Sequence, residues 1–433
     1  MKHTPYWWED RREPTASTIG DGPLHTDILV IGAGYTGLSA AIAASDGGAS
    51  VVVVDAGEPG AGASSRNGGM FGAHPRLSYK ELVRKFGSDA AMRLFREAPL
   101  ALTFAQDLIA REGIACDLQN TGRIQLSWTK ADFEGHKRLA AFLSEKTGVE
   151  ATIVERADLG NEIGTDRYFG GLVIPQHCAI HPAKYFDGLR AAVARRGVPI
   201  FANRPVTRLQ RTTSFKADTP MGQITADKVI LATNGYTDGA FPWHQRRIFP
   251  LPSFLIATEP LSANLLTKLA PGGRMMVETR ARHSYFRLSP DKTRILWGGR
   301  ASMKPISPEV ATQRLRATME EIWPETHGVA LTHSWSGNTG FSFTHMPHVG
   351  EQDGLHYAMG FSGSGTVMAP YLGAKAAWRA LGDDRGETAY AETTLGRHIL
   401  HPGGTPHFLK AADLWYRFAV DPAQNRAAAR DRR

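Results

Sequence analysis

The sequence predicts an α/β protein with a second, α+β domain, and three stretches lead to this prediction. Residues 27–57 read as strand, glycine turn, helix, glycine turn and strand, which is a βαβ unit whose Val- and Ile-rich strands are buried on both faces. Residues 247–340 alternate short strand-like pieces around one helix-like piece, as an antiparallel sheet does. Residues 354–381 return to strand, glycine loop and helix.

Between these stretches the expected elements follow in order. Apolar residues at steps of three and four predict helices over 79–111, 130–148 and 181–197, and residues 122–128 are strand-like. We expect β structure over 201–235. Within the antiparallel region, the expected strands are 253–261, 283–299 with a turn at 289–294, and 331–341, and they frame a helix over 308–323.

The length and composition are those of an ordinary globular protein. With 433 residues, 42% of them hydrophobic, the chain is long enough for two or three domains. Its formal net charge is +8, and part of this charge lies in the terminal stretch NRAAARDRR. The charge alone therefore gives little reason to expect a nucleic-acid partner, and we expect none.

Cysteine usage and hydropathy limit the other kinds of site and the location. Cys116 and Cys178 are the only cysteines and form no CxxC motif, so we expect neither a disulfide framework nor a metal site. The N-terminus lacks the apolar run of a secretory signal, and no apolar stretch of about 20 residues could span a bilayer. We therefore expect a cytoplasmic protein without a membrane span.

A dinucleotide-binding fingerprint lies in the first βαβ unit. Gly32, Gly34 and Gly37 form G-x-G-x-x-G, which permits a tight turn, the approach of a pyrophosphate and close helix packing. The helix N-terminus would present its unpaired N–H groups to the phosphates. Asp55 ends the second strand, where a carboxylate accepts hydrogen bonds from ribose hydroxyls and repels a 2′-phosphate. The neighbouring candidates for cofactor contact are Ala33, Tyr35, Thr36 and Ala56.

Three further motifs lie downstream of the fingerprint. The loop GASSRNGGM (62–70) comes soon after the βαβ unit, VILATNG (229–235) is central, and GFSGSG (360–365) precedes the last long helix. With the fingerprint, these motifs and their order resemble those of the D-amino-acid oxidase superfamily of FAD-dependent amine oxidoreductases, over roughly residues 20–400. Within that superfamily the chain is most similar to the γ-glutamylputrescine oxidase group.

The resemblance implies a Rossmann-type FAD-binding domain interleaved with an antiparallel-sheet substrate domain, with the flavin ring at their interface. The expected FAD-binding domain comprises residues 20–80, 150–240 and 335–400, and the expected substrate domain comprises residues 81–149 and 241–334. Residues 1–19 would be a leader, whose aromatic stretch YWW is expected to pack onto the body, and residues 401–433 a C-terminal tail.

The resemblance places loop 62–70 beneath the flavin ring. Some relatives bond the flavin covalently through a histidine near the position of Asn67, and an amide offers no nucleophile, so we expect FAD to be held non-covalently. Small residues would let the loop backbone approach a flat ring system closely. The loop residues expected to contact the cofactor are Ser64, Ser65, Arg66, Asn67, Gly68 and Gly69.

The other two motifs would contact the same cofactor. A helix that starts near Thr366 would aim its N-terminal N–H groups at the flavin, whose reduced form carries negative charge. Many relatives have a histidine where this chain has Ser364. The resemblance further implies that the backbone of Val206 contacts adenine. The remaining cofactor candidates are Ala232, Thr233, Asn234, Gly235, Gly363, Ser364, Gly365 and Thr366.

Two side chains of the antiparallel region are candidates for a catalytic or substrate-binding role. Tyr285 and Arg287 alternate with Phe286 on an expected strand, so they share one face. If that face lines a cavity, Arg287 would clamp a carboxylate and Tyr285 would donate a hydrogen bond. The alternative is an exposed face opposite Lys292 or Arg294, and the resemblance favours the substrate role.

No Ser/His/Asp or paired-carboxylate arrangement is found in the sequence. The aromatic residues Trp335, Phe341 and Phe361 fit an apolar cavity wall and the core equally well. The histidines are scattered, and each fits a surface or strand residue whose hydrogen bonds are satisfied: His177, His181, His283, His333, His345 and His348.

The expected function is FAD-dependent oxidation of a C–N bond in an amine or amino-acid substrate, with a γ-glutamylated amine as one candidate. In enzymes that this chain resembles, a hydride passes to flavin N5, the imine hydrolyses, and oxygen is the expected electron acceptor. A dehydrogenase of the same fold that uses a quinone or carrier is the alternative, since no lysine that would assist oxygen is identified near Trp297. More remote alternatives are an FAD-linked tRNA-modifying enzyme and a flavoprotein subunit that only relays electrons.

Overall fold

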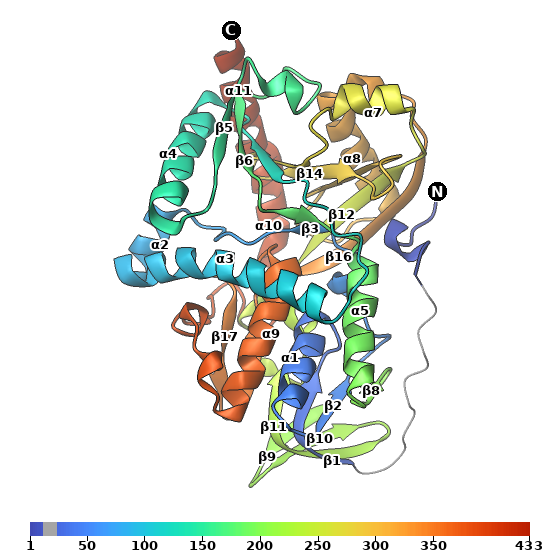
Figure 1. Cartoon of the computed structure of the whole chain (residues 1–433), viewed down its shortest axis with the longest axis vertical. Coiled ribbons are helices and arrows are strands. Elements are labelled where there is room, and N and C mark those ends of the chain that lie inside the picture. The colour runs from blue at the N-terminus through green and yellow to red at the C-terminus, as the bar shows by residue number, and fades with distance from the viewer. Residues whose placement is uncertain (12–23) are drawn as a thin grey trace.

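The computed structural model describes residues 1–11 and 24–433. Its framework is two large β-sheets, one above the other along the long axis of the molecule (Figure 1). The first sheet has the strand order β17-β18-β11-β1-β2-β8, with β10 and β9 attached to β11. Its central pairs, β1 with β11 and β1 with β2, are parallel. The strands are β1 (Leu24–Ile31), β2 (Val51–Val54), β8 (Ile200–Phe201), β9 (Arg208–Arg211), β10 (Phe215–Thr219), β11 (Gly222–Leu231), β17 (His348–Gln352) and β18 (Leu355–Met359).

Helices cover the first sheet, as its uniformly apolar strands require. All four valines of β2 are buried, so both faces of that strand are covered. Helices α1 (Tyr35–Asp46) and α9 (Gly365–Leu381) pack against each other, and α5 (Pro182–Arg195) lies beside α1. The long helix α3 (Ser88–Arg111) contacts α9 and crosses the middle of the molecule between the two sheets (Figure 1).

The second sheet is antiparallel apart from the parallel pair of β4 and β13. Its core is aromatic: Phe286 and Trp297 stack with their ring centroids 4.0 Å apart, and Trp323 meets both rings edge-on. In strand order the sheet comprises β16 (Leu331–Ser342), β12 (Ile248–Thr258), β15 (Ile295–Gly299), β14 (Ser284–Leu288), β13 (Met275–Glu278), β4 (Arg123–Leu126), β6 (Gly170–Ile174) and β5 (Thr152–Glu155).

The remaining elements connect the sheets or pack onto one of the two layers. A two-stranded ribbon pairs β3 (Met70–Phe71) with β7 (Cys178–Ala179). The other α-helices are α2 (Tyr79–Phe86), α4 (Lys130–Thr147), α6 (Pro242–Gln245), α7 (Ala263–Leu269) and α8 (Pro308–Ile322). Short 3-10 helices span Tyr6–Trp8, Ala63–Ser65, Leu159–Asn161, Asn234–Tyr236, Pro324–Thr326, Asp384–Gly386 and Ala389–Ala391. In the part of the chain that the structure describes, no helix has the length and apolar character needed to cross a membrane.

The α/β region with an antiparallel second region is confirmed, but the sheets divide the chain differently from the expected boundaries. Strands β5 and β6 belong to the second sheet because β6 pairs with β4, although we expected residues 150–240 with the first domain. Helix α3 shares a hydrophobic core with the first sheet and its helices, although residues 81–149 were expected in the second domain. Hydrogen-bonded pairing between distant strands decides these positions, and the division of the chain into domains remains a prediction.

The N-terminal residues pack onto the body as expected. Trp7 is fully buried and its Nε1 donates to Asn67 O at 2.7 Å, while Trp8 Nε1 donates to Ser65 Oγ at 2.8 Å. Both bonds end on the loop at residues 62–70, so the leader fastens that loop. Residues 12–19 of the expected leader and residues 20–23 of the expected FAD-binding segment lie outside the described residues.

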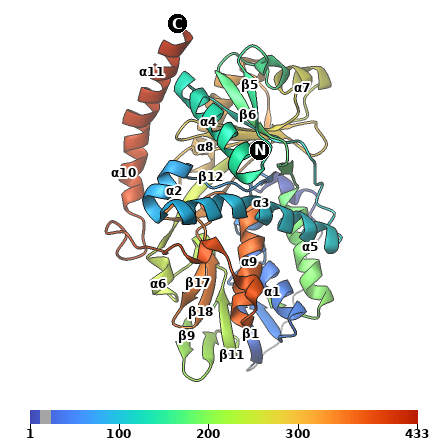
Figure 2. The same ribbon diagram turned by 60° about the vertical axis from the view of Figure 1, so that its left-hand side comes forward.

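The expected C-terminal tail is a helical arm, which we call the C-terminal arm (residues 408–432). Helix α10 (Phe408–Trp415) continues through a π-helical turn (Tyr416–Val420) into α11 (Asp421–Arg432), and the arm stands along one side of the molecule (Figure 2). It is bonded to the segments that flank β13 to β15: Asp413 Oδ1 accepts from Met303 N, Asp421 pairs with Arg282, and Gln424 Oε1 accepts from Ala281 N.

Candidate functional site

The G-x-G-x-x-G turn joins β1 to α1, and each glycine has a steric reason. Gly32 has a φ of +105°, and a Cβ there would lie 2.9 Å from Ala232 O of the neighbouring strand. A Cβ at Gly34 would lie 2.9 Å from Ser64 Oγ, and a Cβ at Gly37 would lie 1.8 Å from Gly32 O. The turn therefore leaves the N-terminus of α1 open at the carboxyl edge of the sheet, where a helix presents N–H groups to an anion.

Asp55 stands at the end of β2 and holds this turn. Its Oδ2 accepts from Ala33 N at 2.7 Å and its Oδ1 accepts from Gly57 N at 3.0 Å. Burial raises the pKa of the Asp55 carboxyl, and the two backbone hydrogen bonds oppose that rise. The carboxylate therefore supports the glycine turn in addition to lining the cavity beside it.

The loop at residues 62–70 is shaped by its asparagine. Asn67 Nδ2 donates to Ser64 O at 2.9 Å, and Gly69 N donates to Asn67 Oδ1 at 2.9 Å, so the amide ties the loop to itself. A Cβ at Gly68 would lie 2.7 Å from the ring of Tyr285, and a Cβ at Gly69 would lie 2.3 Å from Ile180 O. The two glycines are therefore required by contacts with the protein as well as by any bound ring.

A cavity of about 400 Å³, which we call the glycine-lined cavity, lies along the carboxyl edge of the first sheet. It joins the fingerprint turn, loop 62–70, the end of β11 and the N-terminus of α9. The expected cofactor residues that line it are Gly32, Gly34, Tyr35, Thr36, Asp55, Ala56, Ser64, Asn67, Val206, Ala232, Thr233, Asn234, Gly363, Gly365 and Thr366.

Five expected cofactor residues line neither this cavity nor the adjacent one: Ala33, Gly37, Ser65, Gly69 and Gly235. Their surroundings explain their positions. Ala33 N donates to the Asp55 carboxylate, and the other four lie against protein backbone or donate to it. Ser65 is fully buried and its Oγ donates to Gly60 O, and a Cβ at Gly235 would lie 2.9 Å from Gly340 N. The structure thus gives these residues a supporting position behind the cavity wall.

The last glycine loop leads into α9 as the sequence predicted. The helix begins at Gly365, and Thr366 Oγ1 donates to Met70 O at 2.6 Å, which joins the helix start to loop 62–70. Gly363 has a φ of +106°, and Ser364 Oγ donates to Phe361 O. The N-terminus of α9 therefore faces the place where the two cavities meet.

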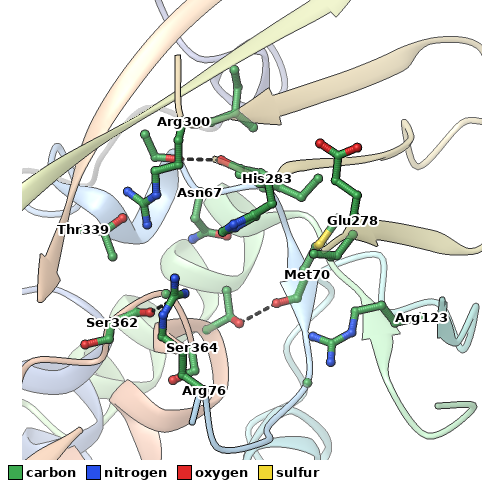
Figure 3. A pocket seen from close by; sticks show the side chains of 18 of the residues that line it. Asn67, Met70, Arg76, Arg123, Glu278, His283, Arg300, Thr339, Ser362 and Ser364 are labelled. Atoms are coloured by element: carbon green, nitrogen blue, oxygen red, sulfur yellow. Dashed lines mark hydrogen bonds between the residues drawn. The ribbon is translucent and has the colours of Figure 1, made fainter. Parts of the chain in front are cut away.

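A second cavity of about 460 Å³ lies between the two sheets, and we call it the arginine-lined cavity (Figure 3). The residues that line both cavities are Ala63, Asn67, Thr339, Gly363 and Thr366, so the two spaces adjoin. Of the other expected cofactor residues, Arg66, Gly68 and Ser364 line this cavity.

Arginines dominate the wall of this cavity. Among residues 1–11 and 24–433, five arginines and one carboxylate, that of Glu278, line it. Arg280 is neutralised by ion pairs with Glu278 and Glu321, whereas Arg76, Arg123 and Arg300 have no ion pair among the described residues. Burial lowers the pKa of Arg123 and of Arg300 to about 10, which still leaves both guanidinium groups charged at neutral pH.

The structure separates the two expected catalytic residues. Tyr285 lines the arginine-lined cavity, and its Oη lies 2.9 Å from Ser253 Oγ. Arg287 lies farther along the same face of β14 and is not among the residues that line the cavity. Its Nη1 donates to Gly69 O at 2.9 Å and to Ile180 O at 2.8 Å, so its guanidinium fastens two backbone segments together.

Among the six histidines weighed from the sequence, His283 lines the cavity. Burial, together with the charges of Arg300 and Arg76, lowers the pKa of His283 to about 3, so its ring is neutral at physiological pH. Trp335 and Phe341 are core residues at the rim: Trp335 Nε1 donates to Arg66 O at 2.8 Å. Phe361 lines the glycine-lined cavity.

The sequence reasoning missed Arg76, Arg123 and Arg300. They come from the segment after β3, the start of β4 and the end of β15, and no motif connects these positions. One usable signal existed for Arg300, because it directly follows the hairpin at residues 283–299 that carries Tyr285.

The two cavities fit an extended dinucleotide with a ring at one end. Gly32, Gly34 and Gly363 line the glycine-lined cavity without a side chain, and the N-termini of α1 and α9 line it as well. A flavin dinucleotide is of this form, with phosphates for the N-terminus of α1 and a ring system for the space between the sheets, next to the N-terminus of α9.

Comparisons with known proteins agree with this fit. Residues 27–379 match the model of the DAO family, described as FAD dependent oxidoreductase. The chain is 29% identical over 386 residues to the gamma-glutamylputrescine oxidoreductase of Escherichia coli (strain K12), covering 87% of this chain and 88% of that one. It is 28% identical over 382 residues to a Rhizobium meliloti (strain 1021) protein named "Probable oxidoreductase OrdL", covering 87% and 88% of the two chains.

The fold has a counterpart among solved structures. The crystal structure of glycine oxidase from Geobacillus kaustophilus superposes with a TM-score of 0.72 at 20% identity, covering 87% of this chain and all of that one. Together with the family match over most of the sequence, the glycine turn and the cavity at the carboxyl edge of the sheet lead to one conclusion. The chain belongs to the DAO family of FAD-dependent oxidoreductases.

Proposed function

We propose that this FAD-dependent oxidoreductase oxidises a C–N bond in a small amine or amino acid that carries a carboxylate, giving an imine that water hydrolyses. The observation that carries the proposal is the pair Arg76 and Arg300, whose guanidinium groups line a cavity adjoining the glycine-lined one and have no ion pair among the described residues. The relative named gamma-glutamylputrescine oxidoreductase supports an amine substrate, and a γ-glutamylated amine is one candidate.

The side chains of the cavity would bind and orient this substrate. A carboxylate is the natural partner of two guanidinium groups, which offer it charge-assisted hydrogen bonds. Because the same positive charges oppose an ammonium group, the cavity favours the neutral amine, whose nitrogen lone pair is free. Tyr285, whose ring lies against loop 62–70, is proposed as a substrate contact. Bound FAD supplies the two-electron acceptor.

We propose that FAD is held without a covalent bond by the residues that line the glycine-lined cavity. Asn67 supports this proposal because its amide is used in hydrogen bonds that shape loop 62–70 and offers no nucleophile. Precipitation of the purified protein in acid should release the yellow cofactor into the supernatant. Colour that stays in the pellet would contradict the proposal.

The proposed activity is tested by anaerobic bleaching of the flavin with an amine panel. Amino acids, γ-glutamyl amines and polyamines are mixed with the holoenzyme, and the visible flavin absorption is followed. At least one carboxylate-bearing amine should bleach the flavin, and Arg300→Gln should raise the concentration for half-maximal rate by about 10-fold to 100-fold. If no member of the panel bleaches the flavin, the proposal fails.

We propose oxygen as the electron acceptor, with a same-fold dehydrogenase as the alternative. The substrate-reduced enzyme is exposed to air, and the return of the flavin absorption is timed. Recovery within seconds supports an oxidase. Reduced flavin that persists for many minutes in air but discharges to a quinone dye would instead establish the dehydrogenase.

Partners and location complete the proposal. We expect no nucleic-acid partner, and activity on small amines in RNA-free protein would exclude the tRNA-modifying alternative. A cytoplasmic location remains a prediction, which cell fractionation would test.

A further inference from the structure

Three of the five arginines of the arginine-lined cavity stand in two separate places. Arg76 and Arg300 form a pair, because their guanidinium carbons lie 5.3 Å and 4.9 Å from the centroid of the same ring, that of Phe341. Arg123 belongs to another wall, where it begins β4 and its Nη2 lies 3.0 Å from His74 Nδ1. In Figure 3 the pair stands on one side of His283 and Arg123 on the other.

Arg123 is a buried cation that has no counter-charge among the residues that the structure describes. Its side chain belongs to a residue with 7% relative exposure, and its buried Nε has no hydrogen-bond partner. Its neighbour His74 brings no negative charge: burial and the charge of Arg123 hold the pKa of His74 well below its usual range, so the ring is a neutral hydrogen-bond partner. A buried charge in this situation is stable only with a partner.

The described residues of the same cavity do not supply that partner. Glu278, the one carboxylate that they place in the cavity wall, accepts from Arg280 Nε at 2.8 Å, from Ser284 N at 2.7 Å and from Tyr168 Oη at 2.9 Å. Both of its oxygens are thus engaged away from Arg123. No described residue thus neutralises Arg123, and an anion bound in the cavity would supply the missing charge.

We propose that Arg123 binds a second anionic group of the substrate, in addition to the carboxylate held by Arg76 and Arg300. The substrate is then a dianionic amine, with the reacting C–N bond between two carboxylates or similar anions. This assignment of substrate class rests on the proposed function, whereas the anion site at Arg123 does not. It also disfavours polyamines, since a free ammonium group would meet unpaired guanidinium groups.

The test compares two non-reacting ligands that differ by one charge: glutarate and its monomethyl ester. Their binding to the oxidised holoenzyme is measured by the change in visible flavin absorption and by calorimetry, in buffer free of sulfate and phosphate. Glutarate should bind about 10-fold to 100-fold more tightly than the ester, the effect of one charge-assisted hydrogen-bonded contact.

Substitutions then assign this difference to its source. Arg123→Gln should abolish the preference for glutarate and change binding of the ester by less than about twofold, while Arg123→Lys should keep most of the preference because it keeps the charge. Arg300→Gln should weaken both ligands. Arg208→Gln, an exposed position on β9, should change neither and serves as the control.

Equal binding of the two ligands by the unaltered enzyme would overturn the inference, as would equal weakening of both ligands by Arg123→Gln. If Arg123→Gln fails to fold, the comparison in the unaltered enzyme and in Arg123→Lys still decides. A glutarate preference without bleaching by any amine would refute the proposed function and leave the anion site standing. Bleaching by amines without a glutarate preference would support the proposed function and refute the anion site.

Discussion

The glycine-lined cavity and the arginine-lined cavity adjoin, but the chain builds them by opposite means. The first is built from backbone: short contiguous motifs at residues 32–37, 62–69 and 363–366 bring N–H groups and empty space to one edge of a sheet. The second is built from side chains, with Arg76, Arg123 and Arg300 arriving from three unrelated segments. If the proposed sites are right, the cofactor is recognised by local geometry and the substrate by charge assembled over long distances.

The sharpest test of how the glycine-lined cavity is built is Gly37→Ala. The added methyl group, on the first turn of α1, would lie 1.8 Å from the backbone oxygen of Gly32. We expect a loss of more than about 4 kcal/mol in the free energy of unfolding and a protein without bound FAD. Urea unfolding and the ratio of visible to ultraviolet absorption measure these effects. Gly160→Ala, where a Cβ would meet nothing, is the matched control, and a yellow Gly37→Ala protein of normal stability would refute the steric account.

A smaller loss of stability is expected from Glu278→Gln in the wall of the arginine-lined cavity. Glu278 is buried and holds Arg280, Ser284 N and Tyr168 together, so its loss leaves Arg280 with Glu321 as its remaining ion-pair partner. We expect a cost of about 3 kcal/mol in urea unfolding, without a change in FAD affinity. Glu155→Gln, on an exposed strand residue, is the control. A change in FAD affinity equal to that in stability would show that the two cavities are not built independently.

Trp7→Phe tests whether the leader supports the backbone-built cavity. The substitution keeps a buried ring and removes the hydrogen bond from Trp7 Nε1 to Asn67 O. We expect about fivefold weaker FAD binding, which corresponds to a loss of about 1 kcal/mol. Titration of the apoprotein with FAD measures this, and Trp415→Phe, at a side chain that is 65% exposed, is the control. Unchanged FAD affinity would mean that the loop keeps its shape without the leader.

The smallest expected effect concerns the junction of α3 with the helices of the first sheet. Hydrogen bonds from Arg196 lower the pKa of Glu112 to about 2. Because the folded-state pKa is depressed, this stabilisation is complete above the ordinary value of 4.5 and is lost as the pH falls to about 2. Glu112→Gln should therefore cost about 1 kcal/mol at pH 7 and nothing near pH 2. Thermal unfolding of both proteins between pH 2 and pH 7 measures the stability lost by Glu112→Gln, and Glu134→Gln is the control. A loss that does not change with pH would contradict the assignment to the Glu112 carboxylate.

The sequence made the backbone-built cavity predictable because the requirements there are local. A glycine with positive φ, a strand before it and a helix after it all lie within a few residues, so spacing alone identified Gly32, Gly34 and the start of α9. Asp55 was found by the same local rule, although its hydrogen bonds to Ala33 N and Gly57 N were not foreseen.

The charge-built cavity was not predictable in the same way. The alternation of side chains along a strand correctly placed Tyr285 and Arg287 on one face of β14. Only part of that face lines the cavity, because the segments beside β3 and β7 cover Arg287. Strand pairing over long sequence distances likewise moved β5 and β6 into the second sheet. Which arginines converge is decided by tertiary structure, and no single segment contains that information.

The C-terminal arm has a thermodynamic consequence for this cavity. Three of its contacts end on Ala281, Arg282 and Met303, which neighbour the cavity residues Arg280, His283 and Arg300. A ligand that binds only the ordered wall must stabilise the docked arm by the same free energy by which the docked arm strengthens ligand binding. Hydrogen-exchange protection of a surface helix at the end of the chain should therefore report whether an interior cavity is filled.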